Sequence, residues 1–189
     1  LFHATEHLLP YLRTVPTVLT VHDLVFEHYP EYHKAWNYHY LHRAMPLFCR
    51  RANAIIAISE HTRRDIIERY AVPADKITVI QEAADPRFAP QSPEHVTQVR
   101  QRLALPARYL LTVGTIEPRK NLTRLVDACG PLFAEGLVDA LVLVGSKGWL
   151  YESFFAHLET LPWRNRVLLP GFVADEDLPA VYAGAVATV

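Results

Sequence analysis

Short apolar runs alternate along the chain with segments whose apolar residues recur every three or four positions. The runs are rich in Val, Ile and Leu, which is typical of buried strands, and the periodic segments are typical of amphipathic helices. Strands are expected at 15–22, 54–58, 76–80, 108–115, 140–145, 166–169 and 185–189. Helices are expected at 33–51, 59–72, 121–133, 150–161 and 175–182. This alternation predicts an α/β fold with parallel sheets, and its regular form from residue 108 onward predicts a sheet covered by helices on both faces.

A proline-rich segment interrupts this alternation. Pro86, Pro90 and Pro93 break any regular element there, and polar residues lie between them. We therefore expect an interdomain connection at this point. The predicted organisation is a first lobe over 1–85, a linker and a helix over 86–104, and a second lobe over 105–189.

The composition narrows the classes of function. The 189 residues carry a formal charge of −1, so bulk electrostatic binding to nucleic acid is not expected. No uninterrupted apolar run reaches the roughly 18 residues that a membrane-spanning helix needs. Cys49 and Cys129 stand alone, without a CxxC pair, and are interpreted as buried, reduced thiols of a cytosolic protein.

The segment 110–122 carries the strongest candidate chemistry. A buried strand leads to Gly114 and then to the adjacent cations Arg119 and Lys120. Asn121 follows and can cap the next helix. Helix N-termini attract anions through free N–H groups and the macrodipole, and the two cations add to that attraction. A diphosphate site and an ordinary strand-to-helix turn with solvated charges explain this pattern equally well.

His22 and Asp23 stand directly after an expected strand, where side chains are held rigidly. Ligands of parallel sheets bind at the carboxyl ends of strands, and other such ends are marked by Gly114, Gly145 and Gly171. A neutral imidazole at His22 could hydrogen-bond a reacting group or accept a proton. The alternative is a loop histidine bonded to nearby backbone. These marked ends, spread over two lobes, predict a cleft between the lobes.

Ten histidines raise the question of a metal. His39 and His42 are spaced like paired ligands on a helix, with His28 and His33 upstream. A catalytic zinc site needs a third protein ligand and outer hydrogen-bond partners. The surrounding aromatic residues favour a helix that packs on the sheet or lines an acceptor groove. We expect no metal.

The loop 171–178 combines a glycine, an aromatic residue and a run of acidic residues before a helix. Such a loop could hold a flat base against backbone groups, and a tight turn before a capped helix is an equally economical interpretation. No GxGxxG, Walker or GxSxG pattern occurs, which disfavours nicotinamide binding and the simplest hydrolase.

In their order and spacing these pieces resemble the retaining glycosyltransferases of the GT-B fold, in the large family called glycosyl transferases group 1. The segments that carry the resemblance are 20–24, 58–62, 77–80, 114–121, 143–145 and 171–178. The resemblance covers nearly the whole chain and is most specific over 114–121. It implies two Rossmann-like lobes with parallel sheets, the first on the acceptor side and the second binding the nucleotide sugar.

The resemblance also implies roles for single residues. Arg119 and Lys120 would hold the donor diphosphate and stabilise charge on the leaving nucleoside diphosphate, so that no metal or other cofactor is expected. Gly114 and Thr115 would form a backbone cradle beside the diphosphate. Gly171, Phe172 and Val173 would lie beside the base. His22 and Asp23 would be the catalytic residues, near the transferred sugar.

The chain departs from the family pattern at three places. Thr115 stands where many relatives carry an arginine, and Arg119 is expected to compensate. Residues 81–85 replace an Asn-Gly pair. The chain starts at Leu1 without an initiator Met, and the paired glutamates of the family are expected beyond Val189. We interpret the sequence as incomplete at both termini and inactive alone.

The expected activity is transfer of a hexose from a nucleoside-diphosphate sugar to a glycan or lipid-linked acceptor, with retention at the anomeric carbon. The protein is expected in the cytoplasm, with peripheral association at the inner face of the membrane left open. A GT-B-like sugar-nucleotide epimerase and a noncatalytic nucleotide-binding module are the alternatives. The sequence identifies neither the donor sugar, the base, the acceptor nor the oligomeric state.

Overall fold

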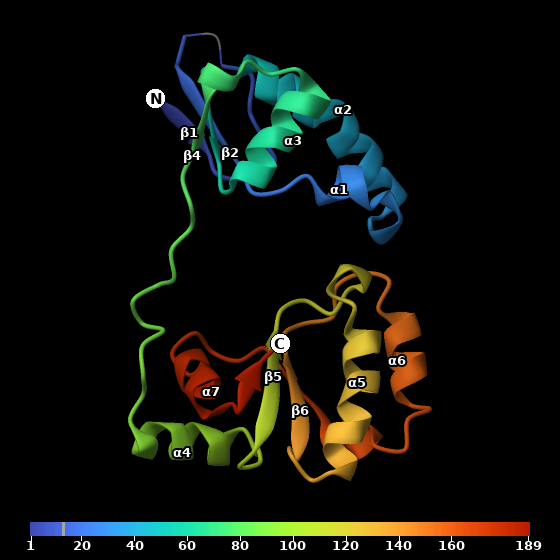
Figure 1. The fold of residues 1–189 in the computed structure, drawn as a ribbon. Helices are drawn as coiled ribbons and strands as arrows, with labels where there is room; N and C mark the ends of the chain where they lie inside the picture. Colours follow the sequence, from blue (N-terminus) through green and yellow to red (C-terminus); the bar gives the residue numbers. More distant parts are fainter. Residues whose placement is uncertain (13) are drawn as a thin grey trace. The chain divides into compact units, whose positions relative to one another are not determined.

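A computed structural model describes residues 1–12 and 14–189 of the chain. The chain forms two compact units, Leu1–Ala84 and Asp85–Val189. Each unit is built on a four-stranded parallel sheet with helices packed against it (Figure 1). The expected α/β class with two parallel sheets is therefore confirmed.

The strands of the first unit follow one another across the sheet in chain order, β1-β2-β3-β4. These strands are β1 (Phe2–Ala4), β2 (Thr17–Val21), β3 (Ala54–Ala57) and β4 (Ile77–Val79). The helices are α1 (Val25–His28), α2 (Ala35–Arg51) and α3 (Glu60–Tyr70), with short 3-10 turns at Pro30–Tyr32 and Ala74–Lys76. Pro46 lies inside α2 without interrupting it.

Helices cover one face of this first sheet. Leu19 and Val21 of β2 are fully buried against the helices, in one core with Met45 of α2. Val18 and Thr20, which point the other way along the same strand, are only partly buried. Among the described residues of this unit, helices therefore cover only one face of the sheet. The reason is that α1, α2 and α3 all pack on the same side (Figure 1).

The ends of α3 follow from local chemistry, as the sequence predicts. The Ser59 hydroxyl accepts a hydrogen bond from the Thr62 backbone N–H at 3.1 Å and so caps the first turn. Ala71 ends the helix in a left-handed conformation, and Pro73 follows it. A rigid α3 matters below because three polar side chains project from it.

The second unit has the strand order β7-β6-β5-β8. Its strands are β5 (Tyr109–Val113), β6 (Ala140–Val144), β7 (Val167–Gly171) and β8 (Ala187–Thr188). Its helices are α4 (Pro93–Arg102), α5 (Leu122–Ala134), α6 (Glu152–Leu158) and α7 (Leu178–Gly184), with 3-10 turns at Pro118–Lys120 and Arg164–Arg166.

Both faces of this second sheet are buried, as predicted. Leu110 and Leu141 pack into the core formed with α5 and α6. Leu111 and Val142, one position further along the same strands, pack into a second core formed with α4 and α7. The two-residue period of the strands sends alternate side chains to the two cores, so an uninterrupted apolar run is needed here.

Two predicted helix caps are wrong. Asn121 takes a left-handed conformation with φ of 50°, and its side chain makes no capping hydrogen bond to α5. Helix α7 begins at Leu178, and the acidic residues before it bind arginines instead of capping it. The Asp177 carboxylate pairs with Arg102 of α4, and that of Asp175 pairs with Arg87. These pairs fasten the segment before β5 to the start of α7.

Each unit holds one buried thiol. Cys49 lies in the core of the first unit and Cys129 in a core of the second, and both are free. Desolvation raises the pKa of Cys49 to about 12 and also raises the pKa of Cys129. The prediction of buried, reduced thiols is confirmed.

The two thiols should report the opening of the two units separately. In Cys49→Ala and Cys129→Ala variants, we expect the remaining thiol to react with a chromogenic disulfide reagent about 100-fold more slowly than a free thiol, because it reacts only when its unit opens. Rates measured across a urea series should rise with unfolding. Labelling of the native chain at the rate of an exposed thiol would contradict the burial.

Candidate functional site

The second sheet has a topological switch point at β5. The chain runs from β5 through α5 to β6 on one face, and from β7 through α7 to β8 on the other. β8 therefore lies beside β5 on the side opposite β6. The connections leave in opposite directions at such a point, which opens a crevice beyond the carboxyl ends of the two strands, where ligands of α/β folds bind.

A hollow of about 510 Å³ occurs at this switch point. Its wall includes the end of β5, Val189 beyond β8, and the first half of α5. Three cationic side chains line it: Arg119, Lys120 and Arg124. The sequence pattern does not single out Arg124, because a lone arginine on an amphipathic helix has the same pattern as any solvated residue.

Arg119 is held in place by a buried carboxylate. Its Nε and Nη2 lie 2.9 and 2.7 Å from the same oxygen of Glu117. The Glu117 side chain is 1% exposed, whereas that of Arg119 is 35% exposed. One edge of the guanidinium, Nε and Nη2, is thus the counter-ion of a desolvated carboxylate, and Nη1 takes no part in these contacts. Sequence reasoning missed Glu117, which positions one of the predicted cations.

Lys120 lies against the turn that ends β5. Its Cε and Nζ are 3.7 and 4.0 Å from the point where a Cβ on Gly114 would be. The ammonium group therefore lies beside bare backbone at the strand end. Arg119 and Lys120 both belong to the 3-10 turn before α5, and Asn121 ends that turn.

The other predicted donor-binding residues border a neighbouring hollow of about 220 Å³. Gly114, Thr115, Phe172 and Val173 line it, and Val113 lines both hollows. Phe172 is 79% exposed, so its ring is available to a ligand. The Val173 side chain is buried in the core, which leaves its backbone as the part that could face a base. Gly171 ends β7 with φ of 78°.

Hydrogen bonds join the turns that follow β5, β6 and β7. Gly114 donates to the Val144 carbonyl at 2.9 Å, and Gly145 donates to the Gly171 carbonyl at 2.8 Å. Gly145 has φ of 140°, and a Cβ built on it would lie 2.1 Å from the Gly114 carbonyl oxygen. Only a glycine allows these two turns to approach each other this closely.

A side chain at position 145 should therefore disrupt the rim of both hollows. We expect Gly145→Ala to lower the free energy of unfolding by about 2 kcal/mol or more, because the methyl group clashes with rigid backbone and the φ is unfavourable. Gly136→Ala is the matched control, since Gly136 also has positive φ but open space around it, and should cost about 1 kcal/mol. Equal losses in urea unfolding would show that the close approach does not matter.

His22 is held between two acceptors in the first unit. Its Nδ1 lies 2.8 Å from Glu82 Oε1, and its Nε2 lies 2.9 Å from the Thr5 carbonyl oxygen. An imidazole donates to both only when both nitrogens carry protons. The Thr5 carbonyl, followed by the Glu82 carboxylate, raises the pKa of His22 against the opposing effect of burial. The geometry thus favours the protonated imidazole, and the contact with the Thr5 carbonyl is the one expected of a loop histidine bonded to nearby backbone.

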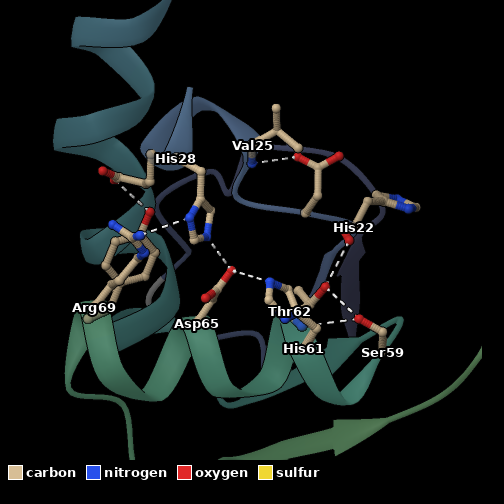
Figure 2. Close-up of polar contacts among 11 residues, drawn as sticks. His22, Val25, His28, Ser59, His61, Thr62, Asp65 and Arg69 are labelled. Carbon is tan, nitrogen blue, oxygen red and sulfur yellow. Dashed lines mark hydrogen bonds and ion pairs between the residues drawn. The ribbon is translucent and has the colours of Figure 1, made fainter. Parts of the chain in front are cut away.

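Asp23 has a local structural contact. Its carboxylate accepts a hydrogen bond from the Val25 backbone N–H at 3.0 Å, at the start of α1 (Figure 2). The Thr62 hydroxyl donates to the His22 carbonyl at 3.1 Å and so fixes the backbone of the strand end (Figure 2). The proposed catalytic roles of His22 and Asp23 stay predictions.

The charge on His22 makes a pH-dependent contribution to stability. Because folding raises its pKa, the contribution is complete below the unfolded value near 6.5 and is lost as the pH rises through the folded value. We expect Glu82→Gln to destabilise the chain more at pH 5.5 than at pH 8.5 in urea unfolding. Glu68→Gln, at an exposed position of α3, should show no such difference. An NMR titration that places the pKa of His22 below 6.5 would contradict the assignment.

The two histidines on α2 have other partners within the described residues. His42 Nδ1 lies 2.9 Å from Glu27 Oε2, and the His39 ring is tilted by 55° against the Tyr38 ring, with 5.2 Å between centroids. His28 has turned to α3, where its Nε2 lies 2.7 Å from Asp65 Oδ2. Each of these three histidines has a partner of its own within the described part of the chain.

Comparison with known proteins agrees with this geometry. The family described as Glycosyltransferase Family 4 matches residues 2–88. The O-antigen chain mannosyltransferase B of Escherichia coli is 32% identical over 98% of the chain and 49% of the relative. The serotype-specific mannosyltransferase WbdA of Escherichia coli is 30% identical over 70% of the chain and 17% of the relative. The chain thus spans about half the length of the first of these relatives.

A solved structure shares the fold. The crystal structure of Anabaena Alr3699/HepE in complex with UDP-glucose matches with a TM-score of 0.69 and 21% identity, over 92% of this chain and 46% of that one. At this level of identity the match shows the fold alone. Taken with the two parallel sheets, it shows that the chain has the fold of the GT-B glycosyltransferases, and the chain is similar in sequence to known glycosyltransferases.

Proposed function

We propose that the protein containing this chain transfers a hexose from a nucleoside-diphosphate sugar to a glycan or lipid-linked acceptor, with retention of configuration. The names of its relatives support mannose as the hexose and a growing polysaccharide as the acceptor, since two of them are mannosyltransferases and one is named for the O-antigen chain. Retention rests on the family resemblance alone.

The observation that carries the proposal is the hollow at the switch point with Arg119, Lys120 and Arg124 in its wall. A nucleotide sugar presents a diphosphate between two neutral groups, so it needs cations beside surfaces for a base and a sugar. The adjoining hollow offers bare backbone at Gly114 and an exposed ring at Phe172. Val113 lines both hollows, which supports one extended ligand that contacts both kinds of surface.

The chemistry follows from charge. Breaking the bond between the anomeric carbon and the diphosphate adds negative charge to the leaving oxygen. Cations that face this oxygen are worth more in the transition state than in the ground state, and that difference lowers the barrier. Glu117 keeps the Arg119 guanidinium oriented before the donor arrives. These side chains supply the charge, so no metal or other cofactor is assigned to the step.

The proposed setting is the cytoplasm, where the donor is made, with the acceptor at the inner face of the membrane. None of the helices in the described part of the chain has the length and hydrophobicity that crossing a bilayer requires.

Removing the two cations should abolish transfer. In the complete protein, we expect Arg119→Ala with Lys120→Ala to lower the transfer rate by about 100-fold or more, because stabilisation of the leaving diphosphate is lost. The measurement is transfer of radiolabelled mannose to a glycan primer. Arg64→Ala, at an exposed position of α3, is the matched control and should leave the rate unchanged. Unchanged transfer by the double variant would refute the assignment.

Calorimetry with UDP, GDP and ADP separates binding from catalysis and identifies the base. Binding of one nucleotide by the wild type and its loss in the double variant would support the donor site. Release of an epimerised sugar nucleotide without any acceptor would instead favour the epimerase. Binding without turnover of any nucleotide sugar would favour a noncatalytic module.

A further inference from the structure

Three potential metal ligands converge between α1 and α3 in the first unit. His28 ends α1, and His61 and Asp65 lie one turn apart on α3, so all three face one another (Figure 2). His28 Nε2 is 2.7 Å and His61 Nε2 is 3.6 Å from Asp65 Oδ2. One ligand atom from each residue lies within 4.8 Å of the others. The transfer proposed above uses none of these residues.

The positions of these side chains are set by structure around them. Asp65 is buried, and its helix is capped by Ser59 and tied to the His22 carbonyl through Thr62. Glu27 also ties α1 to α3, because its carboxylate accepts a hydrogen bond from the hydroxyl of Tyr70, the last residue of α3, at 2.9 Å. Little conformational freedom has to be lost for the three ligands to meet, which favours binding.

We propose that His28, His61 and Asp65 form a binding site for a late first-row divalent cation, with Zn²⁺ as the best fit. Two imidazole nitrogens and one carboxylate oxygen are ligands that Zn²⁺ accepts in tetrahedral sites, with water in the fourth position. Residues four apart on one helix are well placed to bind the same ion. The ion would join α1 to α3, and its place is separate from the donor site because every ligand belongs to the first unit.

Arg69 competes with the metal for His28. Its Nη2 donates to His28 Nδ1 at 3.0 Å, so Nδ1 is an acceptor and the ring proton resides on Nε2, facing Asp65. A metal on Nε2 needs the proton on Nδ1, and Arg69 must then withdraw because two donors cannot face each other. The guanidinium is on an exposed side chain and can rotate into solvent. Arg69 therefore makes the site weaker than its ligands alone would.

The test is titration of the tag-free chain with ZnCl₂ by calorimetry. We expect one equivalent to bind, His61→Ala to weaken binding at least about tenfold, and Arg69→Met to strengthen it. His39→Ala removes another exposed histidine and should leave binding unchanged. His61 is suited to the test because its side chain is 70% exposed, so its loss should not unfold α3. Circular dichroism spectra of each variant check this.

Cobalt gives a second readout. Bound Co²⁺ should show the visible absorption of a tetrahedral site with nitrogen and oxygen ligands, and His61→Ala should abolish it. Equal zinc binding by wild type and His61→Ala, or no binding by either wild type or Arg69→Met, would show that the cluster is only a hydrogen-bonded link between α1 and α3. Neither result would bear on the transferase proposal, because the donor site does not include these residues.

Discussion

The reversal of strand order at β5 is the constraint on which the second unit depends. Because the chain leaves β5 toward one face and returns to β8 from the other, helices must cover both faces, and β5 must be apolar along its whole length. The same reversal leaves a crevice beyond the strand ends that no connection crosses. The reversal of strand order thus explains both where the hollow lies and why β5 is apolar along its length.

Charge within that hollow is distributed unevenly. Arg119 offsets the buried Glu117 carboxylate, whereas Lys120 lies over bare backbone. A desolvated carboxylate needs its counter-ion for the unit to fold, so Arg119 has a structural role in addition to any role with a ligand. Within the described part of the chain, Lys120 and Arg124 form no such ion pair with a buried carboxylate. An anion in the hollow would therefore bind the part of the Arg119 guanidinium that Glu117 leaves free, together with Lys120 and Arg124.

The sequence predicted the parts of the structure that arise from local pattern. The strands of the second unit, the cap at Ser59 and the buried thiols follow from apolar runs and from side-chain chemistry near in sequence. β1 was missed because a three-residue strand has no measurable period. The cap at Asn121 was wrong because asparagine favours both N-caps and the left-handed conformation, and the sequence does not decide between them. The partners of His22 could not be foreseen, since Thr5 and Glu82 are 17 and 60 residues away.

The hydrogen bonds among the turns after β5, β6 and β7 have a consequence for recognition. Gly114, Gly145 and Gly171 link through backbone groups, and Ile116 bridges to Lys147 beside them. The edge of the second sheet behaves as one stiff rim whose conformational entropy is lost when the unit folds. A ligand that binds here would therefore contact a surface that is already ordered. Its binding would cost little further conformational entropy, and its selectivity would depend on shape complementarity with this surface.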